Sequence, residues 1–281
     1  MAKPTLNPES GFRRFIIELS YDGSNYSGWG KQSEQEGVRT IQGALEEALA
    51  KILRTRVDTV VAGRTDAGVH ALHQIAHVDV PKGEWDIENW PYKLNRMLDD
   101  DIRIISVRPA PAHFHARFSA LSRTYIYKIA DAQRTLPPLE RFDIAPWYRN
   151  LDEAKMNEAS ALLLGEHDFR AFCKYRQGGT TIRTLQIFRW ERDEKGYLIA
   201  EVKADAFCYS MVRNLVGAVV SVGEGRADNA WLAQMLEAQE RVPDSYVFPA
   251  RGLTLVSVEY PAEDQLLLRA QRTMARRAED M

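Results

Sequence analysis

The chain has 281 residues, of which 45% are hydrophobic, and its formal net charge at pH 7 is −2. This length allows one large domain or two domains of ordinary size, each with a real core. The net charge gives no bulk signature of nucleic-acid binding, so any basic surface has to be local. The chain has no run of 18 apolar residues and no apolar leader, which predicts a soluble cytoplasmic protein. Cys173 and Cys208 do not make a disulfide framework and are expected to be small, partly buried side chains.

The first half of the chain shows a regular order of expected strands and helices. Thr40 is the expected N-cap of a helix whose apolar face runs from Ile41 to Ile52. From Gln74 onward the period is two, which is typical of a strand. The order is β-α-β-β-α-β, the order of a ferredoxin-like unit. The expected strands are 14–21, 57–61, 74–80 and 102–107, and the expected helices are 41–52 and 88–98.

The second half repeats this scheme. The strand 122–130 is followed by a helix at 151–164 with Asn150 as a possible cap, and a hairpin turns around Asp193–Gly196. Helices at 210–222 and 229–238 and a strand at 253–260 complete it. We therefore predict an α+β fold of two similar ferredoxin-like (RRM-like) halves, with largely antiparallel sheets and a cleft between them. The predicted domains are 1–113, carrying the Asp66 loop, 114–262, and a basic tail at 263–281.

The tail places Arg269, Arg272 and Arg276 at helical spacing, on one basic face. An ordinary solvated helix end and a phosphate contact are both compatible with this pattern.

Familiar cofactor motifs are missing from the sequence. It has no G-x-S-x-G elbow, no phosphate-binding P-loop and no dinucleotide fingerprint. His70, His73 and His77 would share one face of a helix, where they could bind zinc with Asp66 as fourth ligand. On the strand that the pattern favours, His73 and His77 would be about 13 Å apart, at about 3.3 Å per residue, too far for one metal ion. His113 and His115 share a strand face but lack a third ligand, so a metal site is not favoured.

Asp66 stands in the constrained loop AGRTDAGVH, between two apolar runs. An aspartate at such a place is often a turn former or a cap, and this interpretation stays open. Arg64, two residues away, would keep the carboxylate ionised when it is partly desolvated. Gly63 and Gly68 allow backbone shapes that expose both side chains. An ionised aspartate beside an arginine can act as a nucleophile or a base.

Seven segments between about Phe15 and Pro261 resemble one known family, in the same order. They are AGRTDAGVH, YDGSNYSGW, TIQGALEEAL, FHARFSALSRTYIYKI, GEHDFRAF, MVRNLVG and GLTLVSVEYP. The family is that of the TruA-type tRNA pseudouridine synthases. The resemblance implies an isomerase that breaks the N1–C1′ bond of uridine in tRNA, turns the uracil and rejoins it through C5. It implies positions 38, 39 and 40 of the anticodon stem-loop as targets, no metal or other cofactor, and a homodimer.

The same resemblance implies roles for five residues. Asp66 aligns with the essential aspartate, a nucleophile or a base. The ring of Tyr125 would stack on the uracil, and Arg213 would pair with the aspartate. Leu253 would line the pocket, and Arg64 would hold the flipped base or contact its phosphate.

The resemblance also implies an energetic scheme. Flipping a uridine out of a stem costs a few kcal/mol, and stacking on an aromatic ring recovers roughly 1–3 kcal/mol. Phosphate contacts supply further affinity. Candidates for these contacts are Arg13, Arg14, Arg54, Arg56, Arg117 and Arg123.

The sequence departs from the family pattern at three places: Gly30, Tyr209-Ser210 and Thr254. Of these, Tyr209-Ser210 precedes the expected helix that carries Arg213. This departure therefore concerns the RNA contacts expected at that helix. Two other functions are weighed against the isomerase. One is a non-catalytic RNA-binding protein, against which the set of Asp66, Tyr125 and Arg213 argues. The other is a metal-dependent hydrolase using the histidines, which a chelator would inactivate.

Overall fold

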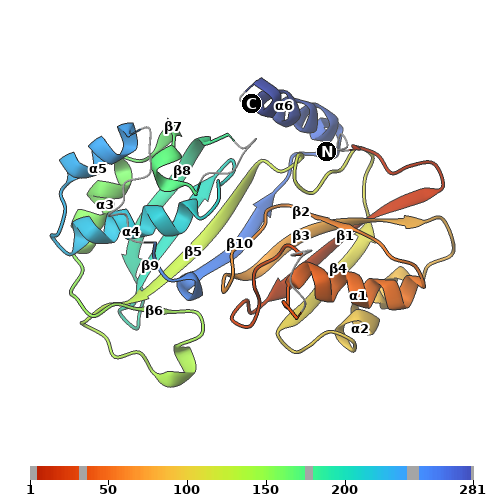
Figure 1. Ribbon diagram of the computed structural model, residues 1–281, viewed down its shortest axis with the longest axis horizontal. Helices are drawn as coiled ribbons and strands as arrows, with labels where there is room; N and C mark the ends of the chain where they lie inside the picture. Colours follow the sequence, from red (N-terminus) through yellow and green to blue (C-terminus); the bar gives the residue numbers. More distant parts are fainter. Residues whose placement is uncertain (1–4, 32–36, 175–179, 239–246, 280–281) are drawn as a thin grey trace. The chain divides into compact units, whose positions relative to one another are not determined.

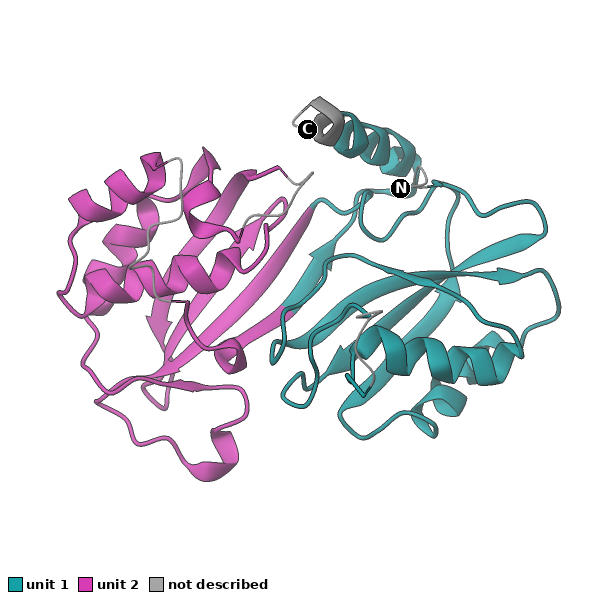
Figure 2. Ribbon diagram, in the orientation of Figure 1, with its two compact units in different colours: residues 1–121, 256–278 teal, residues 122–255, 279–281 magenta. Residues whose placement is uncertain are grey.

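The computed structural model describes residues 5–31, 37–174, 180–238 and 247–279. The chain forms two compact units (Figure 2). Unit 1 comprises residues 1–121 and 256–278, and unit 2 comprises residues 122–255. The fold is mixed α and β, with mostly antiparallel strands. Within the described residues, no helix is long and apolar enough to span a membrane.

Unit 1 has the strand order β4-β1-β3-β2, in which neighbouring strands are antiparallel. Figure 1 shows α1 and α2 on one face of these strands. In the sheet order β10 follows β3, and its residues from 256 onward belong to unit 1. The elements are β1 (Phe12–Tyr21), α1 (Ile41–Leu53), β2 (Thr59–Val61), β3 (His70–Pro81), η1 (Ile87–Asn89), α2 (Trp90–Asn95), β4 (Ile102–Pro109) and β10 (Leu253–Glu259).

The helix α1 begins where the sequence predicts. Thr40 is its N-cap, and the Thr40 hydroxyl accepts a hydrogen bond from the amide of Gly43 at 3.1 Å. This bond satisfies one of the free amides of the first turn. Leu45 and Leu49 are fully buried, so this apolar face forms part of the core. Arg54 ends the helix in a left-handed conformation, with φ 54°.

The helix α2 is shorter than the predicted 88–98. Residues 87–89 form a separate 3-10 turn, and α2 ends at Asn95. The side chain of Asn95 accepts from the amide of Ile104 at 2.7 Å and donates to its carbonyl at 2.9 Å. These bonds tie the end of α2 to β4. A local pattern of apolar residues does not indicate where the helix ends, because the bonds join residues on two different elements.

The strand β3 begins at His70, four residues before the predicted start, and both of its faces are buried in the middle. His77 is buried because the segment 114–116 covers it. The Nδ1 atom of His77 accepts a hydrogen bond from the amide of Ala116 at 3.1 Å. His115 packs edge-on against His77, with ring centroids 4.9 Å apart.

Unit 2 contains the strand order β10-β5-β9-β8-β7, and β10 contributes its residues up to 255 to this unit. Figure 1 shows α3, α4 and α5 gathered on one side of these strands. The predicted hairpin is confirmed as β8 and β9, while β7 was not predicted. The elements are β5 (Ser122–Ala130), η2 (Pro138–Glu140), β6 (Ala145–Pro146), α3 (Glu153–Ala161), β7 (Gly165–Asp168), η3 (Arg170–Phe172), β8 (Ile182–Arg192), β9 (Leu198–Ala204), α4 (Met211–Gly223), α5 (Asn229–Glu237) and η4 (Ala250–Gly252).

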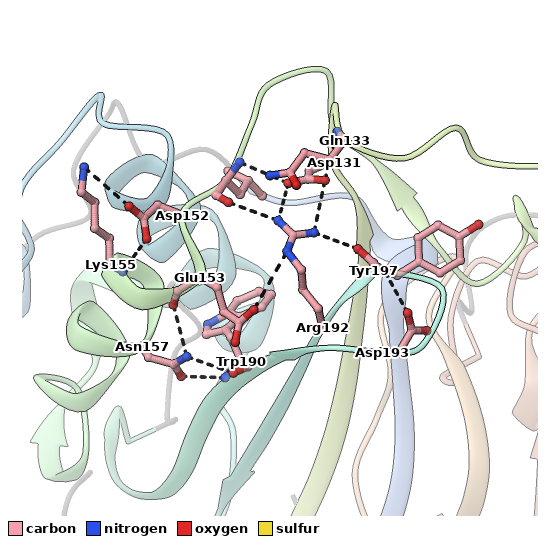
Figure 3. A network of polar contacts seen from close by, with 12 residues as sticks. Asp131, Gln133, Asp152, Glu153, Lys155, Asn157, Trp190, Arg192, Asp193 and Tyr197 are labelled. Atoms are coloured by element: carbon pink, nitrogen blue, oxygen red, sulfur yellow. Dashed lines mark hydrogen bonds and ion pairs between the residues drawn. The ribbon is translucent and has the colours of Figure 1, made fainter.

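The N-cap of α3 is Asp152, and the prediction of Asn150 is wrong. The carboxylate of Asp152 accepts from the amide of Lys155 at 3.1 Å. Leu151 lies outside the helix because its amide donates to the carboxylate of Asp131 at 3.2 Å. Figure 3 shows this part of unit 2.

Asp131 is the centre of a buried polar network (Figure 3). Its side chain has no exposed surface, and it pairs with the Arg192 guanidinium at 2.7 Å. Arg192 also donates to the carbonyls of Gly196 at 2.8 Å and Leu151 at 3.2 Å. The network therefore joins β5, the hairpin β8–β9 and the start of α3.

Cys173 and Cys208 form a disulfide within unit 2, with their Cα atoms 5.8 Å apart. The expectation of two separate thiols is therefore wrong. The two cysteines are 35 residues apart in the sequence. The turn after η3 and the segment before α4 bring them together, and no local pattern indicates this pairing.

The two units differ from the predicted domains in two places. The segment 114–121 belongs to unit 1, where Ala116 contacts His77. The chain from 256 onward also belongs to unit 1, because the amide of Leu121 donates to the carbonyl of Glu259 at 2.7 Å. The tail forms a helix, α6 (Leu266–Glu279), and Arg269 donates to the carbonyl of Ala120 at 3.1 Å. Arg272 is exposed, while the side chain of Arg276 lies outside the described residues.

Candidate active site

The loop that carries Asp66 connects β2 to β3 in unit 1. At its start, the amide of Ala62 donates to the carbonyl of Ile75 at 2.8 Å. At its end, the amide of Val69 donates to the carbonyl of Asp66 at 3.2 Å, which closes a turn. The side chain of Asp66 is only partly exposed. A carboxylate at a turn fixed at both ends can be presented in one orientation.

A second loop, residues 22–30, braces this turn from the side. The amide of Trp29 donates to the carbonyl of Thr65 at 3.1 Å, and the amide of Gly68 donates to the carbonyl of Tyr26 at 3.3 Å. Gly28 has φ 92°, and a Cβ atom there would lie 2.7 Å from the carbonyl oxygen of Thr65. Glycine is therefore required at this position, both by conformation and by space.

A buried polar chain holds the residue that precedes Asp66. The hydroxyls of Tyr21 and Thr65 are 2.8 Å apart. The Gln74 amide donates to the Tyr21 hydroxyl at 3.2 Å and to the carbonyl of Gly63 at 3.0 Å. Burial raises the pKa of Tyr21 to about 12, so the phenol stays protonated at neutral pH. Side chains from β1, the loop and β3 thus hold Gly63 and Thr65, the two residues next to Arg64 in the chain.

Arg64 itself is exposed and lies against the bracing loop. A Cβ atom on Gly30 would come within 3.5 Å of its Nε atom. Gly30 is one of the departures from the family pattern, and the Arg64 side chain occupies the space beside it. A larger residue at position 30 would contact this guanidinium directly.

The bracing loop has its own support, which the sequence analysis missed. The hydroxyl of Tyr26 donates to Asp101 at 2.5 Å, and Arg39 donates to the same hydroxyl at 3.1 Å. The Arg39 guanidinium lies 4.7 Å from the centre of the Tyr26 ring and also pairs with Asp99 at 2.6 Å. Burial, followed by the hydrogen bond to Asp101, raises the pKa of Tyr26 above its ordinary value. These residues are up to 75 positions apart, so no spacing pattern reveals them.

The other predicted site residues lie in unit 2. Tyr125, on β5, is 7% exposed and packs edge-on against Phe207, with ring centroids 5.2 Å apart. Leu253 is buried at the start of β10, the strand next to β5 in the sheet order. Arg213, on α4, is partly exposed, and its Nε atom donates to the carbonyl of Phe248 at 2.7 Å. That bond gives the guanidinium a fixed point of attachment.

The remaining departures from the family pattern lie near these residues. Tyr209 is 47% exposed, and the ammonium group of Lys174 lies 5.5 Å from the centre of its ring. Ser210 precedes α4 in a left-handed conformation, with φ 60°. Thr254 follows Leu253 on β10 and is buried.

The histidines of β3 make three separate contacts. His70 accepts from the amide of Gly23 at 3.1 Å, His73 lies 3.0 Å from Glu18, and His77 is buried against Ala116. Across the described ranges, no group of three His, Cys, Asp or Glu side chains is placed to hold a metal ion.

Comparison with known proteins shows the family to which the chain belongs. The profile of a family described as tRNA pseudouridine synthase matches residues 19–119 and 159–261. The chain belongs to the tRNA pseudouridine synthase family. Proteins named tRNA pseudouridine synthase A from Frankia casuarinae and Streptomyces griseus are 49% and 50% identical to it, over 94% and 93% of this chain and 96% and 93% of their own. The protein of the same name from Mycobacterium leprae is 41% identical, over 92% of this chain and 93% of its own.

Membership of this family makes the chain an isomerase that converts uridine in tRNA to pseudouridine. The synthase carries the Asp66 loop and Arg64 in unit 1, and Tyr125, Arg213 and Leu253 in unit 2. Both matched segments of the family profile, one in each half of the chain, include predicted site residues.

Proposed function

We propose that the synthase isomerises uridines at positions 38, 39 and 40 in the anticodon stem-loop of tRNA, with Asp66 as its catalytic residue. The observation that carries this proposal is the geometry of the Asp66 loop. The turn is closed by a backbone bond, braced by Trp29, and anchored through Thr65, yet Asp66 stays partly exposed. A carboxylate that only capped a turn would need no such bracing from a second loop.

Asp66 acts in this proposal on a flipped uridine, either as a nucleophile toward the nucleoside or as a base in the proton transfers. Unstacking the uridine costs a few kcal/mol. Stacking of the uracil on the Tyr125 ring returns roughly 1–3 kcal/mol. The Tyr125 hydroxyl assists removal of the proton from C5, and the reaction needs no metal ion.

The remaining roles are electrostatic and steric. Arg213 pairs with the Asp66 carboxylate, and Leu253 forms an apolar wall of the pocket. Arg64, exposed beside the aspartate, holds the flipped base or contacts its phosphate. The bond from Arg213 to the Phe248 carbonyl supports the role of Arg213 as the partner of Asp66, because it restricts where the guanidinium can point.

The proposed architecture is two ferredoxin-like halves. The strand orders β4-β1-β3-β2 in unit 1 and β10-β5-β9-β8 in unit 2 support this, because both follow the same split pattern. We further propose that the synthase is cytoplasmic and acts as a homodimer that holds one tRNA.

The direct test is to map pseudouridine in unmodified tRNA transcripts after incubation with the purified synthase. We expect modification at positions 38, 39 and 40, with equal rates in the presence and absence of EDTA. Modification confined to other sites would overturn the target assignment. Loss of activity in EDTA, restored by a divalent metal, would favour the metal-dependent alternative.

A further inference from the structure

A small basic cavity lies in unit 1, beside the start of β1 and the end of β3. This end of the two strands is far from the Asp66 loop. Its volume is about 180 Å³. Arg13, Arg14, Lys82 and His113 contribute to its lining, and the described lining residues include no Asp or Glu. A cavity of this composition favours an anion.

Two of these cations have no acidic partner among the described residues, and the Arg13 guanidinium lies 5.4 Å from the centre of the Phe15 ring. Arg13 and Lys82 are both exposed, and neither makes an ion pair with any residue that the structure describes. Arg13 lies opposite Val80, and the ladder continues with the amide of Lys82 donating to the carbonyl of Gly11 at 2.7 Å. Arg13 and Lys82 are thus diagonal neighbours on the strand pair, about 7–8 Å apart. Their exposed side chains can both reach one anion, which offsets the repulsion between the two positive charges.

The third cation is already neutralised. Arg14 makes two bonds of 2.7 Å to the carboxylate of Asp79 and donates to the carbonyl of Phe114 at 2.8 Å. Arg14 is 5% exposed. It therefore forms a fixed wall of the cavity and leaves Arg13 and Lys82 to attract the ligand.

His113 has two features typical of a binding site. Its backbone is left-handed, with φ 63°, which is costly for a residue other than glycine. Its Nδ1 atom is buried and has no hydrogen-bond partner within the described residues. Buried polar atoms are rarely left in this state without a functional reason.

The cavity cannot hold the uridine that reacts. Arg13 is eight residues from Tyr21, whose hydroxyl contacts Thr65 beside Asp66. At about 3.3 Å per residue, the two ends of β1 are about 26 Å apart. If the substrate occupies both places, the part of it at Arg13 and Lys82 is therefore not the nucleotide that reacts at Asp66.

We propose that this cavity binds a backbone phosphate of the tRNA, outside the nucleotide that is isomerised. The inference rests on the proposed function, because it assumes that tRNA occupies the Asp66 loop. A phosphate group satisfies the charge of Arg13 and Lys82 and fits a site that has no carboxylate in its lining. The contact contributes affinity and fixes how far the tRNA extends along unit 1.

The test is the double variant Arg13→Gln/Lys82→Gln. We expect KM for whole tRNA to rise about tenfold with little change in kcat. The slope of log Kd against log salt should become shallower by about 1, since each lost phosphate contact contributes roughly 0.7–0.9. The penalty should shrink when an isolated anticodon stem-loop replaces whole tRNA.

A matched control removes the same charge elsewhere. Arg189 and Lys195 are exposed and paired with Glu201 and Glu140. If Arg189→Gln/Lys195→Gln changes KM and the salt slope as much as the first double variant, the effect is one of net charge and the inference is overturned. An unchanged salt slope in Arg13→Gln/Lys82→Gln would also overturn it. A third result would overturn the inference as well: inorganic phosphate stabilises the protein against heat through Arg13 and Lys82, but tRNA binding does not depend on these two residues.

Failure of the proposed function is seen separately. If the wild-type synthase modifies no uridine at positions 38–40, the target assignment fails. The salt slope for tRNA binding by the Arg13→Gln/Lys82→Gln variant still reports whether the cavity binds phosphate.

Discussion

The hydroxyl of Tyr21 lies 2.8 Å from the hydroxyl of Thr65, the residue that precedes Asp66 in the chain. Tyr21 is 4% exposed, and Gln74 completes the contact from β3. This contact links the core of unit 1 to the loop whose geometry the proposed chemistry requires.

Tyr21→Phe should therefore lower both stability and rate. The change leaves the buried hydroxyl of Thr65 without its partner and removes one of the two hydrogen bonds of the Gln74 amide, which costs about 1–3 kcal/mol of unfolding free energy. Since a small displacement of a catalytic group is costly, kcat should fall roughly ten- to hundredfold. Urea denaturation and steady-state tritium release measure the two effects.

Tyr92→Phe is the matched control for this change. Tyr92 is 63% exposed, and its hydroxyl accepts from Arg96 at 3.0 Å on the surface. It should leave kcat unchanged. Equal kcat values in Tyr21→Phe and Tyr92→Phe would show that the Tyr21 contact does not position the loop.

The stability of the synthase should fall in mild acid because of two buried histidines. Burial, followed by the positive charges of Arg14 and Arg117, lowers the pKa of His115 to about 4. Burial, again followed by Arg14, also lowers the pKa of His77 well below 6.5. The unfolded chain takes up these protons more readily than the folded chain. Stability is therefore complete above pH 6.5 and is lost as pH falls from 6.5 through about 4.

The His115 share of this loss is about 3 kcal/mol, the equivalent of a pKa difference of about 2.5. Urea midpoints between pH 4 and pH 7.5 measure it. His115→Asn keeps an acceptor for the amides of Arg117 and Phe118, which now donate to Nδ1 at 3.2 Å. This variant should flatten the pH dependence. An unchanged pH dependence would mean that His115 titrates normally in the folded protein.

Arg192→Met should destabilise unit 2 strongly. The substitution leaves the fully buried carboxylate of Asp131 without its partner (Figure 3). Removal of one member of a buried pair costs about 3–5 kcal/mol. Arg189→Gln, on the same strand, removes an exposed pair and should have little effect. Similar urea midpoints for the two variants would contradict this account of the Asp131 network.

Arg213→Ala should lower the rate of isomerisation by orders of magnitude. Loss of the guanidinium removes the proposed partner of Asp66, and displacement of a catalytic group by about 1 Å can cost about 100-fold in rate. Arg213→Lys keeps the charge but loses the Nε bond to the Phe248 carbonyl, and should be intermediate. Single-turnover rates with tRNA measure both. An effect below tenfold in Arg213→Ala would mean that Arg213 does not partner the acid.

Local patterns predicted those parts of the structure that local forces decide. The N-cap of α1 at Thr40 and the hairpin around Asp193–Gly196 follow from spacing, turn residues and capping, and both are confirmed. The histidine-rich segment forms a strand as its period of two indicates. The family resemblance, rather than spacing, assigned roles to the residues of unit 2.

Long-range contacts decided the remaining features. Asp131 draws the amide of Leu151 out of α3, which moves the cap to Asp152. The contact of Tyr26 with Asp101 spans 75 positions, and the disulfide of Cys173 and Cys208 spans 35. Each of these two contacts depends on where the rest of the fold places the second residue. The sequence around either residue therefore does not indicate the contact.

The measurement that tests the central claim most directly is tritium release from 5-tritiated uridine in tRNA by Asp66→Asn. The substitution preserves size and removes the charge. Since Asp66 acts in the proposed chemistry, release should be abolished while the Kd for tRNA changes little. Asp86→Asn, which removes an exposed carboxylate paired with Lys93 at 2.8 Å, serves as the matched control and should remain active. Release by Asp66→Asn at a rate comparable to the wild type would contradict the assignment of Asp66 as the catalytic residue.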